Sequence, residues 1–211
     1  MDELSTQDKI LNCALQEFME KGFLNASLRQ IVKNAGVTTG AMYRYYNSKE
    51  ALFQALVDKH AEYILNLFNT TIDQFEKMPA DHQTDMMYET SSDCIQKMLD
   101  YIYEHLDAFH LILEHSEGTP YANFIHQLVE REVDSTYKYL ETLQKAGYHV
   151  KHINKNLIHI IASGLFSAMF ETVIHDMPKE EANEYVIQLR RFYSAGWSEL
   201  FDLDFLKTKQ K

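Results

Sequence analysis

The spacing of apolar residues constrains the fold of this 211-residue chain more than any other feature. Along most of the chain, apolar side chains recur every three or four positions, which places them on one face of an α-helix. Strand-like alternation is nearly absent, and only three prolines and seven glycines interrupt the pattern. The sequence therefore predicts an all-α protein.

The first two helices are predicted from their capping residues. One helix starts at Ser5 and ends at Gly22, because a serine can cap a helix N-terminus and glycine tolerates the backbone that ends one. The next starts at Ser27, with Gln30 as its capping-box partner, and ends before Gly36. Both are short enough to belong to a small domain.

A third helix is predicted over residues 38–45, and a long fourth one from Asn47 to about residue 76. Two short helices joined through Gly36 are typical of a helix-turn-helix, because glycine permits the tight turn. The second helix of such a motif lies in the major groove of DNA. Within the sequence YRYY, residues 43–46, Tyr43, Arg44 and Tyr45 supply groups that reach phosphates or base edges. A solvated helix with half-buried tyrosines is the alternative interpretation.

The rest of the chain keeps the helical pattern. Further helices are predicted over residues 84–105, 107–115, 120–146, 153–176 and 180–201. No repeat or flexible linker separates them from the N-terminal segment. We therefore expect a helix-turn-helix domain over residues 1–50, joined rigidly by the long fourth helix to a helical domain over residues 51–211.

Charge is distributed unevenly along the chain. Residues 1–60 contain seven acidic and seven basic residues, so the whole formal net charge of −11 lies after residue 60. The N-terminal segment is thus the only part that a polyanion does not repel. The start, MDELSTQDKI, is acidic and polar where a secretory signal is basic and then apolar, and no run of about 18 apolar residues occurs. A cytoplasmic protein without a membrane segment is expected.

Residues 22–56 read GFLNASLRQIVKNAGVTTGAMYRYYNSKEALFQAL and resemble the DNA-binding segment of the TetR family of bacterial transcriptional regulators. The shared pattern includes the glycine-aromatic pair, the Ala-Gly-Val turn, the glycine and tyrosines of the recognition helix, and Ser-Lys-Glu at the start of helix four. Val32 stands where the family usually has alanine, and Tyr46 where it usually has phenylalanine. Both are expected core positions, as are Ile31, Val37 and Met42.

The resemblance implies roles for individual residues in binding double-stranded DNA with a palindromic operator. Phosphate binding is assigned to Ser27, Thr38, Tyr43 and Lys49. The first two stand at helix N-termini, which favour anions. Lysine in the first turn of helix four opposes the helix dipole, and an anionic partner would explain it. Base reading is assigned to Arg29, Thr39, Gly40, Ala41, Arg44 and Tyr45.

The C-terminal region is expected to supply dimerisation and ligand binding. Family resemblance implies a homodimer in which the last two helices pair with their twofold mates, with packing only within the monomer as the alternative. The interface is assigned to Ala162, Gly164, Ala168, Leu189, Tyr193 and Trp197. Methionines and aromatic residues suit an adaptable apolar pocket, although each of them is also an ordinary core residue. The pocket is assigned to Tyr63, Leu67, Phe68, Met98, Tyr101, Phe109, Phe124, Tyr137, Phe166 and Phe170.

No cofactor or metal site is predicted. His105, His110 and His115 recur every five residues, which winds them around a helix, and no HExxH, phosphate-binding loop or nucleophile elbow occurs. We therefore expect a regulator that is not an enzyme: a repressor released from its operator when a small apolar or aromatic molecule, with a cationic one as a further option, tilts the fourth helix. A helical enzyme or ligand carrier that retains the N-terminal fold is the alternative.

Overall fold

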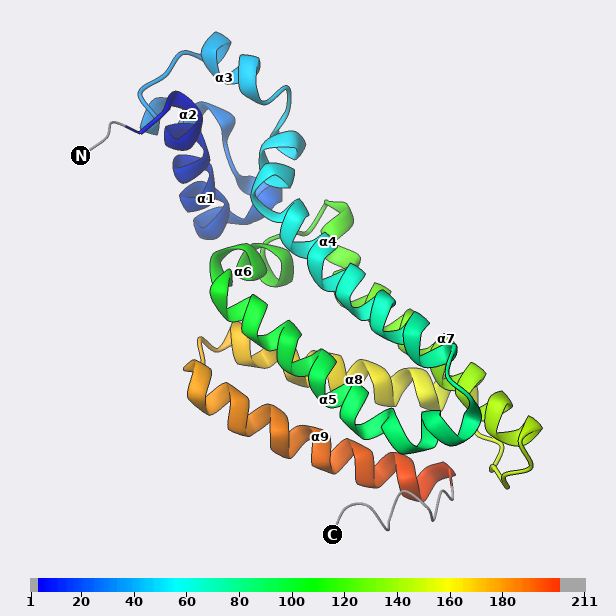
Figure 1. Ribbon diagram of the computed structural model, residues 1–211. Helices are drawn as coiled ribbons and strands as arrows, with labels where there is room; N and C mark the ends of the chain where they lie inside the picture. Colours follow the sequence, from blue (N-terminus) through cyan, green and yellow to red (C-terminus); the bar gives the residue numbers. More distant parts are fainter. Residues whose placement is uncertain (1–3, 202–211) are drawn as a thin grey trace. The chain divides into compact units, whose positions relative to one another are not determined.

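The computed structural model describes residues 4–201, and all of the regular secondary structure among them is helical, which confirms the predicted fold class (Figure 1). The ends of the two predicted domains, residues 1–3 and 202–211, lie outside the described residues. The elements are α1 (Thr6–Asn25), α2 (Leu28–Asn34), α3 (Thr39–Tyr45), α4 (Lys49–Glu76), α5 (Ala80–Glu104), α6 (Leu106–Glu114), the 3-10 helix η1 (Pro120–Asn123), α7 (Phe124–Lys145), α8 (Lys155–Ile174) and α9 (Lys179–Phe201).

The chain forms two compact units. The first contains Met1–Tyr63 and His105–Phe124, and the second contains Ile64–Glu104 and Ile125–Lys211. Helix α4 passes from the first unit into the second, while α6 and η1 belong to the first, a grouping that the sequence pattern did not indicate. The expected domain boundary after residue 50 stays a prediction.

Local hydrogen bonds start and end the short helices of the first unit. The side chains of Ser5, Ser27 and Thr38 accept the backbone N–H groups of the third residue after each, as capping requires. Gly22, at φ 69°, interrupts α1, and Gly36, at φ 66°, follows α2. These left-handed backbone conformations favour glycine, so both helix ends follow directly from the sequence.

Two of the predicted caps are wrong in detail. Helix α4 is capped by Ser48, whose hydroxyl accepts the Ala51 N–H at 3.1 Å, instead of by Asn47. At α2, the Gln30 side chain does not return to the Ser27 N–H. The carboxylate of Glu17 accepts that N–H at 3.0 Å, and Glu17 is itself buried. A buried acid on α1 thus fixes the start of α2, which local sequence reasoning does not anticipate.

Aromatic rings form the core of the first unit. The rings of Phe18, Phe23 and Phe53 lie 5.1–6.1 Å apart, centroid to centroid, and join the C-terminal half of α1 to α4. The predicted core residues Ile31, Met42 and Tyr46 are buried, and Val37 is only partly covered.

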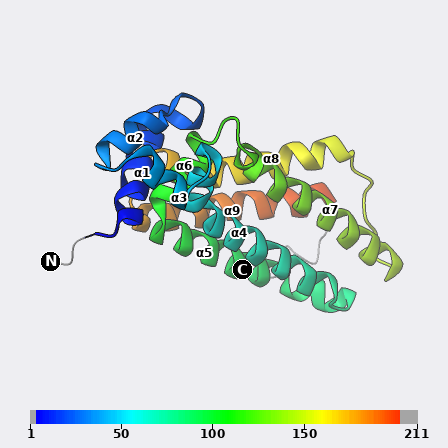
Figure 2. The ribbon, with the colours of Figure 1, turned by 90° about the horizontal axis from the view of Figure 1, so that it is seen from above.

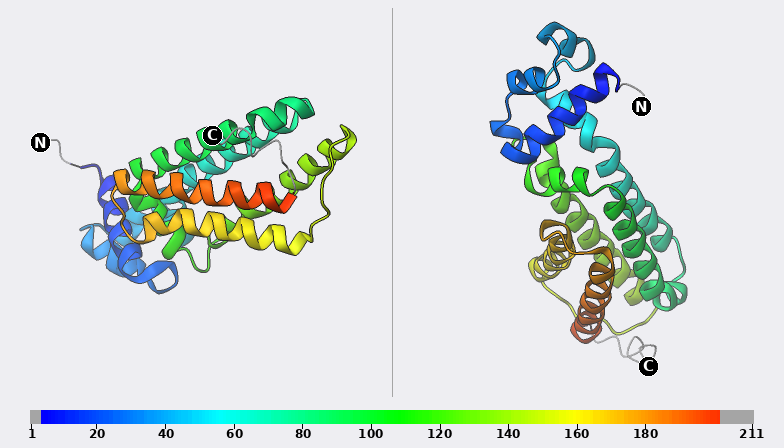
Figure 3. Two further views of the ribbon diagram at one scale, coloured as in Figure 1. Left: turned by 90° about the horizontal axis from the view of Figure 1, so that it is seen from below. Right: turned by 90° about the vertical axis from the view of Figure 1, so that its left-hand side faces the viewer.

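The second unit is built from α5, α7, α8, α9 and the last part of α4. Helices α8 and α9 run side by side in opposite directions, as the yellow and orange ribbons of Figures 2 and 3 show. Their close approach depends on Gly164, where an added Cβ would lie 2.7 Å from the Tyr193 hydroxyl. Arg131 of α7 donates to Asp73 at 2.5 Å and to Glu76 at 2.8 Å, which ties α7 to the end of α4.

Helix α8 is, among the described helices, the one whose length and composition would suit a membrane span. His159, Ser163 and Glu171 interrupt it, so it is not a continuous apolar run, and the expectation of a protein without a membrane segment stays a prediction. Ile158, Phe166 and Phe170 on α8 are buried inside the second unit, which accounts for part of this apolar character. Leu157 and Ile160 are exposed.

A buried histidine, His60, lies against a half-buried one, His105, in the first unit. His60 is 7 % exposed, and its ring lies 4.4 Å from that of His105, centroid to centroid. Burial, together with the positive potential of His105 and Lys59, lowers the pKa of His60 to about 4. His60 is therefore neutral in the folded protein at pH values where an unfolded histidine is protonated.

This histidine should make the fold acid-sensitive. Because the pKa of His60 is lowered on folding, protonation of this histidine favours the unfolded state. The free energy of unfolding therefore keeps its full value above about pH 6.5 and declines as the pH falls toward about 4. Urea unfolding at pH 7, 6 and 5 should show a steep decline for the wild type and a shallower one for His60→Leu. The exposed His82→Gln variant should keep the wild-type slope, and a parallel decline in all three proteins would contradict the assignment.

Candidate nucleic-acid interface and effector cavity

Helix α3 presents most of its side chains to solvent. Among its seven residues only Met42 is buried, whereas Tyr43 is 51 % exposed and Tyr45 is 48 % exposed. Arg44 on α3 and Arg29 on α2 are also exposed. One apolar side chain therefore docks this helix onto α1 and α2, and its other groups are available to another molecule.

The exposed arginines and tyrosines of this surface are not used inside the protein. Within residues 4–201, the side chains of Arg29, Tyr43, Arg44 and Tyr45 form no hydrogen bond or ion pair. A guanidinium group normally finds a carboxylate or carbonyl partner when the fold provides one. Leaving two of them unpaired beside two tyrosines produces a surface that suits phosphates and base edges.

The hydroxyl groups at the starts of α2 and α3 can each still donate a hydrogen bond. Ser27 and Thr38 each accept a backbone N–H within their own helix, so each hydroxyl can still donate to an external acceptor. Both residues are exposed. Their predicted role as phosphate donors is compatible with this geometry and stays a prediction.

Gly40 has no packing reason to be glycine. A Cβ added there would meet nothing within 4 Å, and the backbone of Gly40 is helical. Alanine would strengthen a helix at this position by up to about 1 kcal/mol. The absence of a side chain is explained if another molecule approaches the backbone of α3 closely. Thr39 beside it is exposed and Ala41 partly so.

Lys49 is held inside the first unit. Its ammonium group donates to the carbonyl oxygens of Leu24 at 3.0 Å and Ala26 at 3.3 Å, and lies 4.7 Å from the centre of the Phe23 ring. The lysine therefore has a structural explanation within the chain, and an anionic partner is not needed to explain its place in the first turn of α4. Its role in phosphate binding stays a prediction from family resemblance.

A cavity of about 610 Å³ lies within the second unit. We call it the α7–α9 cavity, and its walls come from α5, α7, α8 and α9. Its lining residues are Thr84, Asp85, Met87, Tyr88, Glu89, Ser91, Ile95, Glu132, Thr136, Tyr139, Leu165, Arg190, Arg191, Tyr193, Ser194, Trp197 and Phe201. Aromatic rings dominate the side contributed by α9. A volume of this size fits a small organic ligand.

Two polar groups on one face of α7 line this cavity without partners in the described chain. Glu132, which faces the cavity, forms no hydrogen bond there, and loss of hydration raises the pKa of its carboxyl to about 6. Tyr139 is 6 % exposed, and its hydroxyl has no hydrogen-bond partner. Thr136 lies between them at helical spacing. The Tyr139 hydroxyl is buried without a partner, and Glu132 is half-buried on the same helical face, so these two mark where a ligand could supply hydrogen bonds.

Arg190 on α9 also lines the cavity, and its guanidinium group has hydrogen-bond partners within the chain. Its guanidinium donates to the Ser92 hydroxyl at 2.6 Å and the Tyr88 carbonyl at 3.4 Å, and it lies 5.2 Å from the centre of the Tyr88 ring. Burial lowers the pKa of Arg190. Among the described residues that line this cavity, the Tyr139 hydroxyl is the buried side-chain atom without a partner, and Glu132 is half-buried.

The residues predicted from the sequence to line a pocket lie elsewhere. Phe68, Met98, Phe166 and Phe170 are buried, and the rings of Phe68 and Phe166 pack edge to face. These four are buried in the second unit, and their assignment to a ligand pocket stays a prediction. Of the remaining six residues, Phe109 and Phe124 are buried in the first unit, and Tyr63 is exposed. Leu67 and Tyr101 are half-buried. Tyr137 is also half-buried and lines a separate open depression of about 770 Å³.

Several residues predicted for a dimer interface also face inward. Ala162 is 1 % exposed, which leaves it no surface for a partner, and Tyr193 and Trp197 line the α7–α9 cavity. Gly164, Ala168 and Leu189 are half-buried. Four large apolar residues outside the predicted interface set are exposed on the same two helices: Leu157, Ile160, Ile187 and Phe192.

Comparison with known proteins identifies the N-terminal segment. Residues 10–56 match the family described as bacterial regulatory proteins, tetR family. The chain is 38% identical over 68 residues to the HTH-type transcriptional regulator UidR of Escherichia coli (strain K12), which covers 32% of this chain and 35% of UidR. It is 40% identical over 52 residues to the HTH-type transcriptional regulator SrpR of Pseudomonas putida, covering 25% of this chain and 24% of SrpR. The matches thus span about a third or less of these relatives.

Solved structures resemble the chain over most of its length. SCO3833, a TetR-family member from Streptomyces coelicolor A3, has a TM-score of 0.56 at 16% identity and covers 92% of each chain. The transcriptional regulator FadR from Bacillus subtilis, in complex with stearoyl-CoA, has a TM-score of 0.50 at 15% identity and covers 86% of this chain and 96% of FadR. At these identities the likeness establishes the fold.

Gly40 offers a test that separates DNA contact from stability. Gly40→Ala should leave the free protein as stable as wild type or up to about 1 kcal/mol more stable, because a Cβ meets nothing there. The same change should weaken binding to an operator recovered by selection from random DNA, since the methyl group would meet the approaching bases. Gly196→Ala, also in open space on α9, serves as the control. Full DNA affinity in Gly40→Ala would contradict close approach at α3.

Proposed function

Because residues 10–56 carry the DNA-binding segment of the TetR family, and the chain as a whole has the fold of that family's regulators, we propose that it is a ligand-responsive transcriptional repressor. The observation that carries this proposal is the exposed, unpartnered set of arginines and tyrosines on α2 and α3. In this proposal α3 enters the major groove. Arg29, Arg44 and Tyr45 read bases, Thr39, Gly40 and Ala41 permit close approach, and Ser27, Thr38, Tyr43 and Lys49 hold phosphates.

The proposed repressor is a homodimer on a palindromic operator. Support comes from α8 and α9, where Ile160 is 65 % exposed and Phe192 is 73 % exposed, with Leu157 and Ile187 nearby in sequence. Large apolar side chains exposed on two adjacent helices favour burial against a second copy. A dimer places two recognition helices on half-sites about 34–36 Å apart.

The proposed effector occupies the α7–α9 cavity. Glu132 needs a hydrogen-bond donor, and the walls supply the rings of Tyr88, Tyr193 and Trp197. A protonated amine would satisfy the carboxylate, and aromatic rings stabilise a cation that lies against their faces. The effector class that fits is therefore an aromatic or apolar molecule that carries an amine.

The effector signal would travel through α7 to α4. Glu132 in the cavity is adjacent in sequence to Arg131, which holds Asp73 and Glu76 at the end of α4. Helix α4 is 28 residues long, or about 42 Å at the usual helical rise, and begins at Lys49 in the first unit. A ligand that shifts α7 would pull on one end of this helix, and by linkage its affinity must differ between the free and DNA-bound states.

The base-reading assignment is tested with the two arginines. Arg29→Ala or Arg44→Ala should cost about 1–3 kcal/mol of operator binding and relax the preference at one base pair per half-site. Tyr43→Phe should instead weaken binding to all sequences alike, because a phosphate carries no sequence information. Lys77→Ala, which removes a charge from the second unit, is the control. Wild-type selectivity in both arginine variants would contradict the assignment.

The effector assignment is tested with aromatic amines and their neutral isosteres. The amines should raise the melting temperature of the wild type and release it from the operator, and Glu132→Gln should lose at least about tenfold in amine affinity, a difference of about 1.4 kcal/mol. Glu89→Gln, a change at an exposed residue of the same cavity, is the matched control. Equal loss in both variants would mean that net charge, and not Glu132, attracts the amine.

Transmission is tested separately with Arg131→Met. Combined with Lys138→Met, this change should leave amine and operator binding intact but impair release of DNA, because α7 then loses its ion pairs to Asp73 and Glu76 at the end of α4. Lys145→Met, which removes a more distant exposed pair on α7, should behave as wild type. Normal release by the double variant would place the coupling on another helix.

A further inference from the structure

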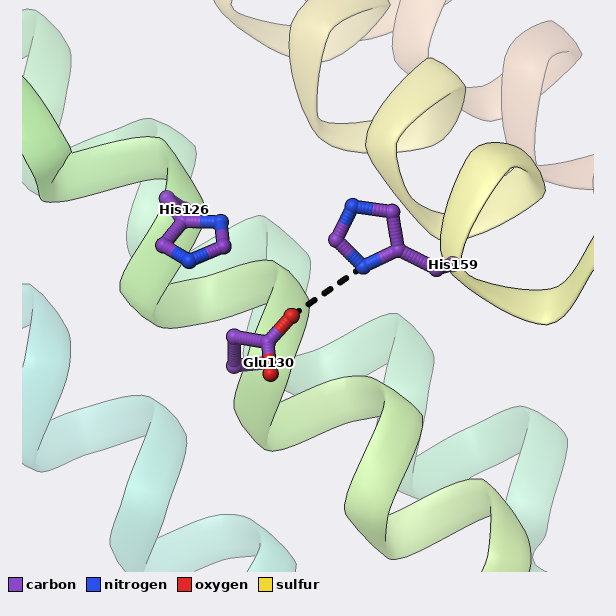
Figure 4. A group of neighbouring side chains, drawn as sticks. All are labelled: His126, Glu130 and His159. Atoms are coloured by element: carbon purple, nitrogen blue, oxygen red, sulfur yellow. Dashed lines mark ion pairs between the residues drawn. The ribbon is translucent and has the colours of Figure 1, made fainter. Parts of the chain in front are cut away.

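Three metal-binding side chains meet between α7 and α8. His126 and Glu130 are four residues apart on α7, so they share one face of the helix, and His159 faces them from α8 (Figure 4). One nitrogen from each imidazole and one Glu130 oxygen all lie within 4.8 Å of one another. The group lies within the second unit and is distinct from the α7–α9 cavity.

The spacing of these donor atoms is close to that of a coordinated ion. Zinc bonds to imidazole nitrogen and carboxylate oxygen at about 2.0–2.2 Å, which places tetrahedral donors about 3.4 Å apart. The His159 Nδ1 and Glu130 Oε1 atoms are already 3.1 Å apart. The side chains of Glu130 and His159 are 51% and 38% exposed, and His126 is exposed, so small rotations would close the remaining distance.

We propose that His126, Glu130 and His159 form a binding site for a divalent transition metal, with zinc as the ion that fits best. Two imidazoles and one carboxylate select zinc and its neighbours over calcium or magnesium, which prefer all-oxygen sites. Three protein ligands leave one position of a tetrahedral ion for water.

The surroundings of the site favour a cation. Asp134 continues the α7 stripe four residues beyond Glu130, and its carboxylate lies 3.8 Å from the ammonium of Lys155 on α8. The facing sides of α7 and α8 thus contain two carboxylates, two imidazoles and one ammonium group. Glu130–His159 and Asp134–Lys155 form two successive cross-links between the helices.

A bound ion would clamp α7 to α8. His126 and Glu130 come from α7, His159 comes from α8, and 28 residues separate Glu130 from His159 in the chain. Because the ion binds the folded arrangement and not the unfolded chain, it would stabilise the second unit. The clamp stands on these three residues alone and does not depend on the proposed regulatory function.

Titration of the tag-free protein with zinc alone tests this site. Competition with a chromophoric chelator should give one zinc per chain. Free zinc at about a hundred times the dissociation constant should raise the melting temperature by several degrees. Cobalt(II) in place of zinc should give a visible absorption band from the imidazole and carboxylate ligands. His126→Ala, His159→Ala and Glu130→Gln should each weaken zinc binding at least about tenfold.

Two control variants keep the test specific. His175→Ala removes an exposed imidazole paired with Glu171 on α8, and Asp134→Asn removes a carboxylate next to the site; neither should lower zinc affinity tenfold. Wild-type affinity in both His126→Ala and His159→Ala would overturn the site. One zinc per two chains would also overturn it, because the ligands would then come from two copies. All ligand residues are at least partly exposed, so the variants should fold normally.

Discussion

The ammonium group of Lys49 holds together the segments on which the first unit depends. It donates to the carbonyl oxygens of Leu24, in the last turn of α1, and Ala26, the residue after this helix, where carbonyl groups lack helical partners. Its contact with the Phe23 ring adds a further attachment. The start of α4 is thereby fixed to the chain immediately before Ser27, where α2 begins. Any displacement of α4 at this end must move the start of α2 as well.

Features that depend on neighbouring residues were predictable from the sequence. The caps at Ser5, Ser27 and Thr38 and the breaks at Gly22 and Gly36 involve hydrogen bonds or backbone angles within a few residues, so the pattern is sufficient to place them. The exposed surface of α3 follows from the same periodicity. Glu17 was not predictable in this way, because its bond to the Ser27 N–H spans ten residues between two helices.

The cavity was not predictable because the same residue types fill cores and line pockets. Phe68, Met98 and Phe166 pack against other apolar groups, and nothing in their identity separates them from Tyr193 or Trp197, which face a space. A better signal was the face of α7 on which Glu132, Thr136 and Tyr139 recur at helical spacing. An acid among residues that will be buried is informative, because burying it has a cost that core packing does not repay. The partner wall, with Arg190, comes from more than fifty residues away and needs the tertiary structure.

The shallow anchoring of α3 has a consequence for how the first unit recognises another molecule. Seven residues are fewer than the roughly 12–15 that an isolated helix needs, and Met42 is the one α3 side chain buried against the rest. Such a segment opens locally at low cost, so its amide hydrogens should exchange with solvent much faster than those of α1. Ordering α3 then offsets part of the binding free energy, so recognition is partly a folding event. Binding should show a negative heat-capacity change and an unfavourable entropy, both larger than rigid docking would give.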